Sequence, residues 1–243
     1  MKHTNKLAIA ILLLSQALSG TALAVPVTVA GTSVSFTFDS ALSGLFGAPT
    51  VTGDVIFFTP TTYVAQSFNG AGLAWANQTF NITVNANPGY FMSAVNLTEN
   101  GDYFNMGADS SVAVGGKFYV RDLESPLAPA ASSKIKSTLP LTDMTSMADF
   151  ETTDWTSHTN IAIPAGWGGA DGMVSGVNVT IENILLAYSK NLGDAAFIEK
   201  KFIGLNVVTA PVPEPETYAM LLVGLGLVGF AVRRRARISS GRA

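Results

Sequence analysis

The feature that most constrains the fold is a strict two-residue alternation of apolar and polar side chains. In VSFTFD, Val34, Phe36 and Phe38 alternate with polar residues, and FNITVN (80–85) and VNVTIE (177–182) repeat the pattern. Because successive side chains of a β-strand point to opposite faces, this pattern predicts antiparallel strands with one buried and one wet face. We therefore predict an all-β body over residues 25–210, folded as an antiparallel, jelly-roll-like β-sandwich.

Turn signals divide the remaining apolar runs into further strands. Asn-Gly pairs at 69–70 and 100–101 predict turns, and Gly115-Gly116 predicts a tight hairpin. The strands expected between such signals are Thr50–Phe58, Tyr90–Thr98, Ser111–Val114, Gly116–Arg121, Ile184–Ser189 and Phe197–Val208. Residues 123–175 lack this regular spacing, so we expect one long loop insertion there, with a short helix at 141–150.

The N-terminal 24 residues have the composition of a secretory signal peptide. Lys2 and Lys6 precede an apolar run over residues 7–14, and Ala22-Leu23-Ala24 forms a small-x-small cleavage site. The apolar run is too short for a permanent membrane span. We therefore predict a signal helix over residues 1–24 that is cleaved after Ala24.

The charge of the predicted body excludes one class of partner. Seven of the 14 basic residues lie in the two terminal segments, whereas 15 of the 17 acidic residues lie in residues 25–210. The body therefore has a formal charge of −8, against −3 for the whole chain. An acidic body of this kind predicts no nucleic-acid partner. The absence of cysteine also excludes thiolate catalysis and cysteine-ligated metals.

The C-terminal segment combines a rigid motif, an apolar run and a basic cluster. The apolar residues Ala219–Val232 would span about 22 Å as a helix, less than the ~30 Å hydrocarbon core. Pro213-Glu214-Pro215, before this apolar run, favours an extended backbone. Arg233–Arg235, after the run, are expected to stay on the cytoplasmic side of the membrane. We expect a short, transient transmembrane helix at 218–232.

In this order, these three parts resemble the PEP-CTERM sorting signal of Gram-negative bacteria, over residues 212–237. The resemblance implies recognition by an exosortase, transient insertion in the inner membrane, and release to the cell surface or extracellular matrix. A tail of this kind is also labelled an ice-binding protein C-terminal domain, which implies nothing about the body. The implied sorting motif is Val212, Pro213, Glu214 and Pro215, and the implied transmembrane and stop-transfer residues are Ala219, Leu221, Leu222, Val223, Leu225, Leu227, Val228, Phe230, Arg233, Arg234 and Arg235.

The body offers two weaker candidate sites. Trp155 and Trp167 lie within the predicted insertion, where exposed aromatic rings would stack on sugars, although core packing explains the same residues more simply. The acidic stretch Asp149–His158 supplies carboxylates and the body's one histidine, which is the minimum for a secreted hydrolase or a calcium site. Its spacing matches no known metal or nucleophile motif, so we predict no catalytic residues, no metal and no cofactor.

These observations favour an exported, non-catalytic surface or extracellular-matrix protein of structural role, processed by an exosortase. One alternative is a carbohydrate-binding or adhesive module that contacts exopolysaccharide. The second alternative is a secreted hydrolase that uses the residues near Asp149–His158.

Overall fold

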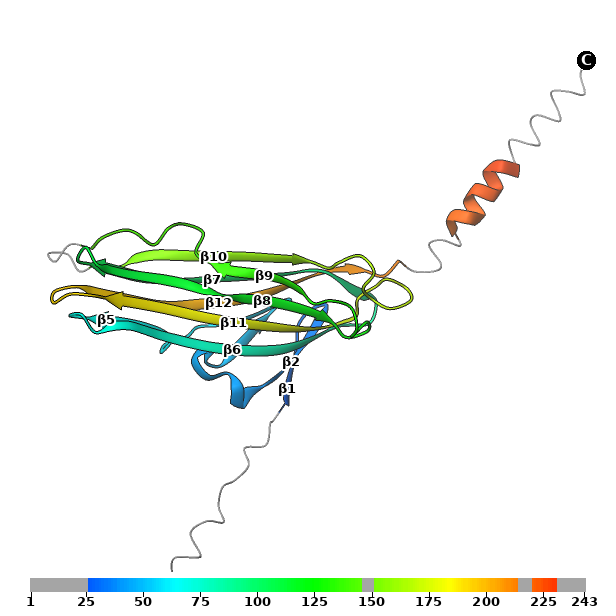
Figure 1. The fold of residues 1–243 in the computed structure, drawn as a ribbon. Helices are drawn as coiled ribbons and strands as arrows, with labels where there is room; N and C mark the ends of the chain where they lie inside the picture. Colours follow the sequence, from blue (N-terminus) through cyan, green and yellow to red (C-terminus); the bar gives the residue numbers. More distant parts are fainter. Residues whose placement is uncertain (1–25, 146–150, 214–219, 231–243) are drawn as a thin grey trace, which may run out of the picture.

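The computed structural model describes residues 26–145, 151–213 and 220–230, and two antiparallel sheets dominate it (Figure 1). The first sheet has the order β1 (Pro26–Ala30), β2 (Val34–Asp39), β6 (Gly72–Ala86), β11 (Gly176–Ser189), β8 (Ser110–Asp122) and β9 (Ala131–Lys136). The second has the order β10 (Thr153–Ala162), β7 (Tyr90–Met106), β12 (Ala195–Pro211), β4 (Val55–Phe58) and β3 (Pro49–Thr52), with β5 (Val64–Phe68) paired to the other end of β12. Two 3₁₀ turns, η1 (Ser40–Leu42) and η2 (Gly44–Phe46), follow β2.

The two sheets pack face to face as a β-sandwich, which confirms the predicted all-β class. In β2, Val34, Phe36 and Phe38 are buried while the residues between them are partly exposed, as the alternation predicts. Phe58 from the second sheet meets Phe80 from the first with ring centroids 5.0 Å apart in an edge-on arrangement. Such burial of apolar side chains from both sheets is the main stabilising contribution to the fold.

Consecutive long strands alternate between the two sheets. The chain runs from β6 in the first sheet to β7 in the second, then to β8 in the first, and β10, β11 and β12 alternate in the same way. Long strands that are neighbours within a sheet, such as β6 and β11, are therefore distant in sequence. The finer jelly-roll-like description stays a prediction.

Two predicted local features are wrong because glycine has more than one structural role. Gly115 and Gly116 form no hairpin but lie inside the continuous strand β8, opposite Ile184 and Asn183. A Cβ on Gly116 would overlap a backbone carbonyl of β11, so glycine there permits close strand approach. Conversely, the predicted strand Thr50–Phe58 is divided into β3 and β4 by a turn in which Gly53 has φ of 59°.

A third error concerns Asn100-Gly101, which lies inside β7, whereas Asn69-Gly70 forms the predicted turn, between β5 and β6. Asn69 and Gly70 have φ of 54° and 77°, in the left-handed region that such a turn requires. The local dipeptide was the same at both places, so tertiary pairing decided between them.

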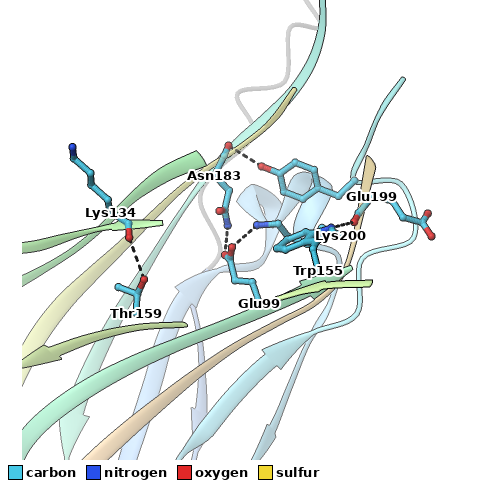
Figure 2. Close-up of polar contacts among 8 residues, drawn as sticks. Glu99, Lys134, Trp155, Thr159, Asn183, Glu199 and Lys200 are labelled. Atoms are coloured by element: carbon cyan, nitrogen blue, oxygen red, sulfur yellow. Dashed lines mark hydrogen bonds and ion pairs between the residues drawn. The ribbon is translucent and has the colours of Figure 1, made fainter. Parts of the chain in front are cut away.

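The predicted insertion at 123–175 is not a single loop. It contains β9, the edge of the first sheet, and β10, the edge of the second. Ser157 and Thr159 are polar but face inward on β10. The strand therefore lacks the alternation of apolar and polar residues by which it could be predicted. The Thr159 hydroxyl donates to the Lys134 carbonyl of β9 at 3.2 Å, so this inward hydroxyl links the two sheet edges (Figure 2).

The predicted short helix and terminal helices are covered only in part. Residues 141–145 form no regular structure, and 146–150 lie outside the described residues. The predicted signal helix at 1–24 also lies outside them, as do both ends of the predicted helix at 218–232. Residues 220–230 are helical, and within the described part of the chain no helix has the length and apolar character needed to cross a membrane.

Candidate functional site

The C-terminal segment leaves the sandwich at the end of β12. The Val212 N–H donates to the Gly89 carbonyl at 2.8 Å, so Val212 is the last residue held to the body by a backbone hydrogen bond among those described. Pro213 beyond it is exposed, whereas Glu214 and Pro215 lie outside the described residues. The predicted sorting motif therefore begins where the folded body ends.

The described part of the apolar run presents its side chains to the surroundings. The exposed members of the predicted transmembrane set are Leu221, Leu222, Val223, Leu225, Leu227, Val228 and Phe230. The remaining predicted residues of the two terminal signals, Ala22, Ala24, Ala219, Arg233, Arg234 and Arg235, lie outside the described residues.

The two tryptophans predicted as a sugar platform are buried instead. Trp155 is 2% exposed and Trp167 is 4% exposed, and both belong to the hydrophobic core. The Trp155 indole N–H donates to the Glu199 carbonyl at 3.0 Å, which satisfies its one polar atom inside the sandwich (Figure 2). Neither ring has an open face, so the core-packing explanation holds for both residues.

The acidic stretch does not assemble into a catalytic or metal site among the described residues. His158 lies on β10 with its side chain exposed, and its Nδ1 contacts the Thr98 hydroxyl at 3.2 Å. Asp154 is exposed on the same outward face, and Asp149 lies outside the described residues. Within the described ranges, no cluster of three or more histidine and carboxylate side chains could hold a metal ion.

An exposed aromatic does occur on the outer face of the first sheet, which we call the wet face. Trp75 of β6 is 62% exposed and stands opposite Leu186 of β11. Leu73 and Tyr188, opposite each other, continue the apolar end of this face.

Polar side chains line two shallow hollows on the wet face, of which the first begins at Asn77, two residues along β6 from Trp75. Asn77, Thr79, Lys117 and Glu182 line the first, and Glu182 is shared with the second. The remaining polar residues of the second hollow are Tyr119, Arg121, Asn178 and Thr180. Amide, hydroxyl and charged groups beside an aromatic ring can hydrogen-bond sugar hydroxyls while the ring stacks on the sugar face.

A second polar group lies deep between the sheets. Glu99 of β7 accepts hydrogen bonds from the Lys200 ammonium of β12 and from the Asn183 amide of β11, each at 2.6 Å (Figure 2). The Lys200 and Glu99 side chains have no exposed surface, and Asn183 is 3% exposed. Burial lowers the pKa of Lys200, and the attraction of Glu99 only partly opposes this effect.

A β-bulge selects which of two adjacent lysines enters this cluster. The pairing of β12 with β7 shifts register between Lys200 and Phe202, so Lys200 faces inward while Lys201 faces outward. Lys201 instead forms an ion pair with Asp102 at 2.6 Å on the outer side of the second sheet. The sequence does not predict this cluster, because two adjacent lysines give no indication that either is buried. In addition, Asn100-Gly101 beside Glu99 favours a turn.

Aromatic side chains enclose the buried group. The Lys200 Nζ lies 5.5 Å from the ring centroids of both Tyr63 and Trp155. The Tyr63 hydroxyl donates to the backbone carbonyl of Asn183 at 2.8 Å. Burial raises the pKa of Tyr63, so the hydroxyl stays protonated and remains a donor. The Asn183 Oδ1 is buried and has no hydrogen-bond partner.

Comparison with known proteins adds one specific finding. The PEP-CTERM protein-sorting motif matches residues 211–235, which confirms the predicted signal and indicates an exported protein processed by an exosortase. No curated protein sequence matches the chain.

Two solved structures align weakly with the chain. A structure of infectious bursal disease virus Gt strain is 12% identical over 72% of this chain and 49% of that chain, with a TM-score of 0.25. This chain thus spans about half of that one. TmCBM61 in complex with beta-1,4-galactotriose is 9% identical over 60% of this chain and 89% of that chain, with a TM-score of 0.19. At such TM-scores neither likeness bears on the function of this chain.

Proposed function

We propose that this chain is an exported, non-catalytic protein of the bacterial surface or extracellular matrix, with a structural role for its sandwich. The observation that carries the proposal is the PEP-CTERM motif at residues 211–235, directly after the last strand of the body. Pro213, within the motif, is exposed and so is accessible to a membrane-bound exosortase. The acidic body suits release into water, because anionic lipid headgroups would repel it.

The hydrolase alternative has less support. A general base needs an oriented partner within hydrogen-bond reach, and the described contact of His158 is a threonine hydroxyl. We expect that changing Asp154 and His158 to alanine leaves any activity found for the protein unaltered.

Sorting is tested by replacing Pro213, Glu214 and Pro215 with alanine and following the full chain by membrane fractionation and C-terminal peptide detection. We expect the variant to accumulate unprocessed in the inner membrane. The matched control is Pro126→Ala with Pro129→Ala, two exposed loop prolines that should leave release unchanged. Normal processing of the triple-alanine variant would refute exosortase sorting through this motif.

A second candidate function is glycan binding at the wet face, such as to exopolysaccharide. It is favoured by the exposed Trp75 and by the hollow on the same face, lined by Asn77, Thr79, Lys117 and Glu182. An aromatic stacking contact is worth about 0.5–1.5 kcal/mol, so Trp75→Ala should weaken binding roughly 2–12-fold.

This second function is tested by titrating the protein with purified exopolysaccharide and a glycan panel. Phe68→Ala is the control, because Phe68 is an exposed aromatic on the second sheet and lies outside the wet face. Equal affinity of the wild type and Trp75→Ala, or no binding by the wild type to any glycan, would eliminate this candidate.

A further inference from the structure

The buried cluster brings together a nucleophile, an electrophile and a proton carrier. Lys200 supplies an amine, Asn183 supplies a carboxamide, and each contacts a different oxygen of the Glu99 carboxylate at 2.6 Å. The three come from β12, β11 and β7, so both sheets contribute (Figure 2).

We propose that Lys200 and Asn183 form an intramolecular isopeptide bond, with Glu99 as the proton carrier. The bond would join the first sheet to the second through the middle of the sandwich. This modification goes beyond the proposed function, because it concerns the covalent structure of the body and not its sorting.

The reaction is an amide exchange that balances without an oxidant or a cofactor. Glu99 Oε2 takes one proton from the Lys200 ammonium, and the neutral Nζ attacks the Asn183 Cγ. The Nζ–Cγ bond forms and the Cγ–Nδ2 bond breaks, so Nδ2 leaves as ammonia. Of the three Nζ protons, one stays on the new amide, one goes to the leaving ammonia through the carboxylate, and one stays on Glu99.

The surroundings favour the neutral amine that this step needs. Two opposite charges inside an apolar core cost several kcal/mol each in lost hydration, and proton transfer from Lys200 to Glu99 removes both. The lowered pKa of Lys200 agrees with this direction. Because the groups are held together by the fold, attack gains the advantage of an intramolecular reaction.

The contacts of the Asn183 side chain favour departure of its nitrogen. Asn183 Oδ1 lacks a hydrogen-bond partner, so the carboxamide is only half satisfied in the core. Its Nδ2, the leaving group, already touches Glu99, which can deliver the proton that it needs. The cross-link would replace the buried ion pair and the Asn183 carboxamide by one amide and a neutral carboxyl group.

A covalent tie of this kind suits a cysteine-free body. The chain has no disulfide to hold its sheets together. An isopeptide bond needs no oxidising compartment and resists reduction. It would close the loop from β11 to β12, two strands that lie in different sheets.

Peptide mass spectrometry of the purified full chain tests the proposal. Trypsin would release residues 137–190 and 191–200 separately if Lys200 were free. With the bond in place, cleavage after Lys200 is blocked, and residues 137–190 should appear joined to 191–201 at the summed mass less one ammonia. Recovery of only the separate peptides from the folded wild type would overturn the proposal and leave an ordinary buried ion pair.

Variants separate the roles within the cluster. Lys200→Met should abolish the joined peptide, whereas Lys201→Arg, the matched control on the outward lysine, should keep the joined species with its terminal residue changed. Glu99→Gln should slow bond formation about 10²–10⁴-fold, as expected for loss of a general acid–base. Wild-type closure rates in a Glu99→Gln protein with native circular dichroism would refute the proton-carrier role.

Discussion

Truncation of Trp155 gives the sharpest test of how the sandwich is held together. Its side chain is 2% exposed, its indole N–H bonds the Glu199 carbonyl, and its ring lies beside the Lys200 ammonium. Trp155→Ala opens a cavity in the core, for which losses of about 3–5 kcal/mol are typical. Loss of the hydrogen bond to the Glu199 backbone carbonyl, worth about 0.5–1.5 kcal/mol, places the expected loss at the upper end of that range.

The loss is measured by guanidinium denaturation of the wild type and the variant, followed by far-UV circular dichroism. We expect the midpoint to fall with an unchanged m value, and Tm to fall by roughly 10 °C or more for a domain of this size. The control is Trp75→Ala, the same substitution at a residue that is 62% exposed, which should cost within about 0.5 kcal/mol. A loss below about 1 kcal/mol for Trp155→Ala, or equal losses at both sites, would refute the core assignment of Trp155.

Three further outcomes follow from buried polar groups and close strand contacts. Burial by itself raises the pKa of Asp122. The hydrogen bonds that its carboxylate accepts from backbone N–H groups outweigh this effect and hold the pKa below its ordinary value. Its stabilising contribution is therefore present above pH ~4 and is lost as the pH falls through the lower folded pKa, so Asp122→Asn should flatten the acid limb of the stability–pH curve. Gly116→Ala should lower the free energy of unfolding, measured by denaturation, by about 2–3 kcal/mol, because its φ is 150° and the Cβ would meet the facing backbone. The control Gly115→Ala, whose Cβ meets one side chain at 3.2 Å, should cost about 1 kcal/mol. Equal costs would argue against the continuous strand. Tyr63→Phe should cost about 0.5–1.5 kcal/mol in the same assay by removing its hydrogen bond to the Asn183 backbone carbonyl, and a neutral result would contradict that hydrogen bond.

Strands with apolar inward residues could be predicted from the sequence, and those with polar inward residues could not. β2, β6 and β11 show the alternation in their letters, because Val, Ile and Phe fill their inward positions. β10 hides it, because Ser157 and Thr159 face inward toward the opposite sheet edge. The alternation reports side-chain polarity, whereas burial also depends on hydrogen-bond partners that come from elsewhere in the chain.

The candidate sites divide in the same way. The sorting segment is a linear signal, read in order from Val212 to Arg235, so the sequence was sufficient to identify it. The wet face around Trp75 is formed by three strands in register, so a linear pattern does not identify it. Trp155 and Trp167, the candidates for sugar stacking in the sequence, have both rings in the core.

By itself, the sequence determined the all-β class and the C-terminal sorting motif of this protein, because period-two patterning and a contiguous motif are local properties of a chain. Only the tertiary structure decided which glycines end strands, which tryptophan is exposed, and that Lys200 meets Glu99 and Asn183. Those outcomes depend on strand register, on one β-bulge and on pairing between distant residues such as Glu99 and Lys200, which are 101 positions apart. Contacts of that kind are set by the packing of two sheets and leave no trace in neighbouring letters.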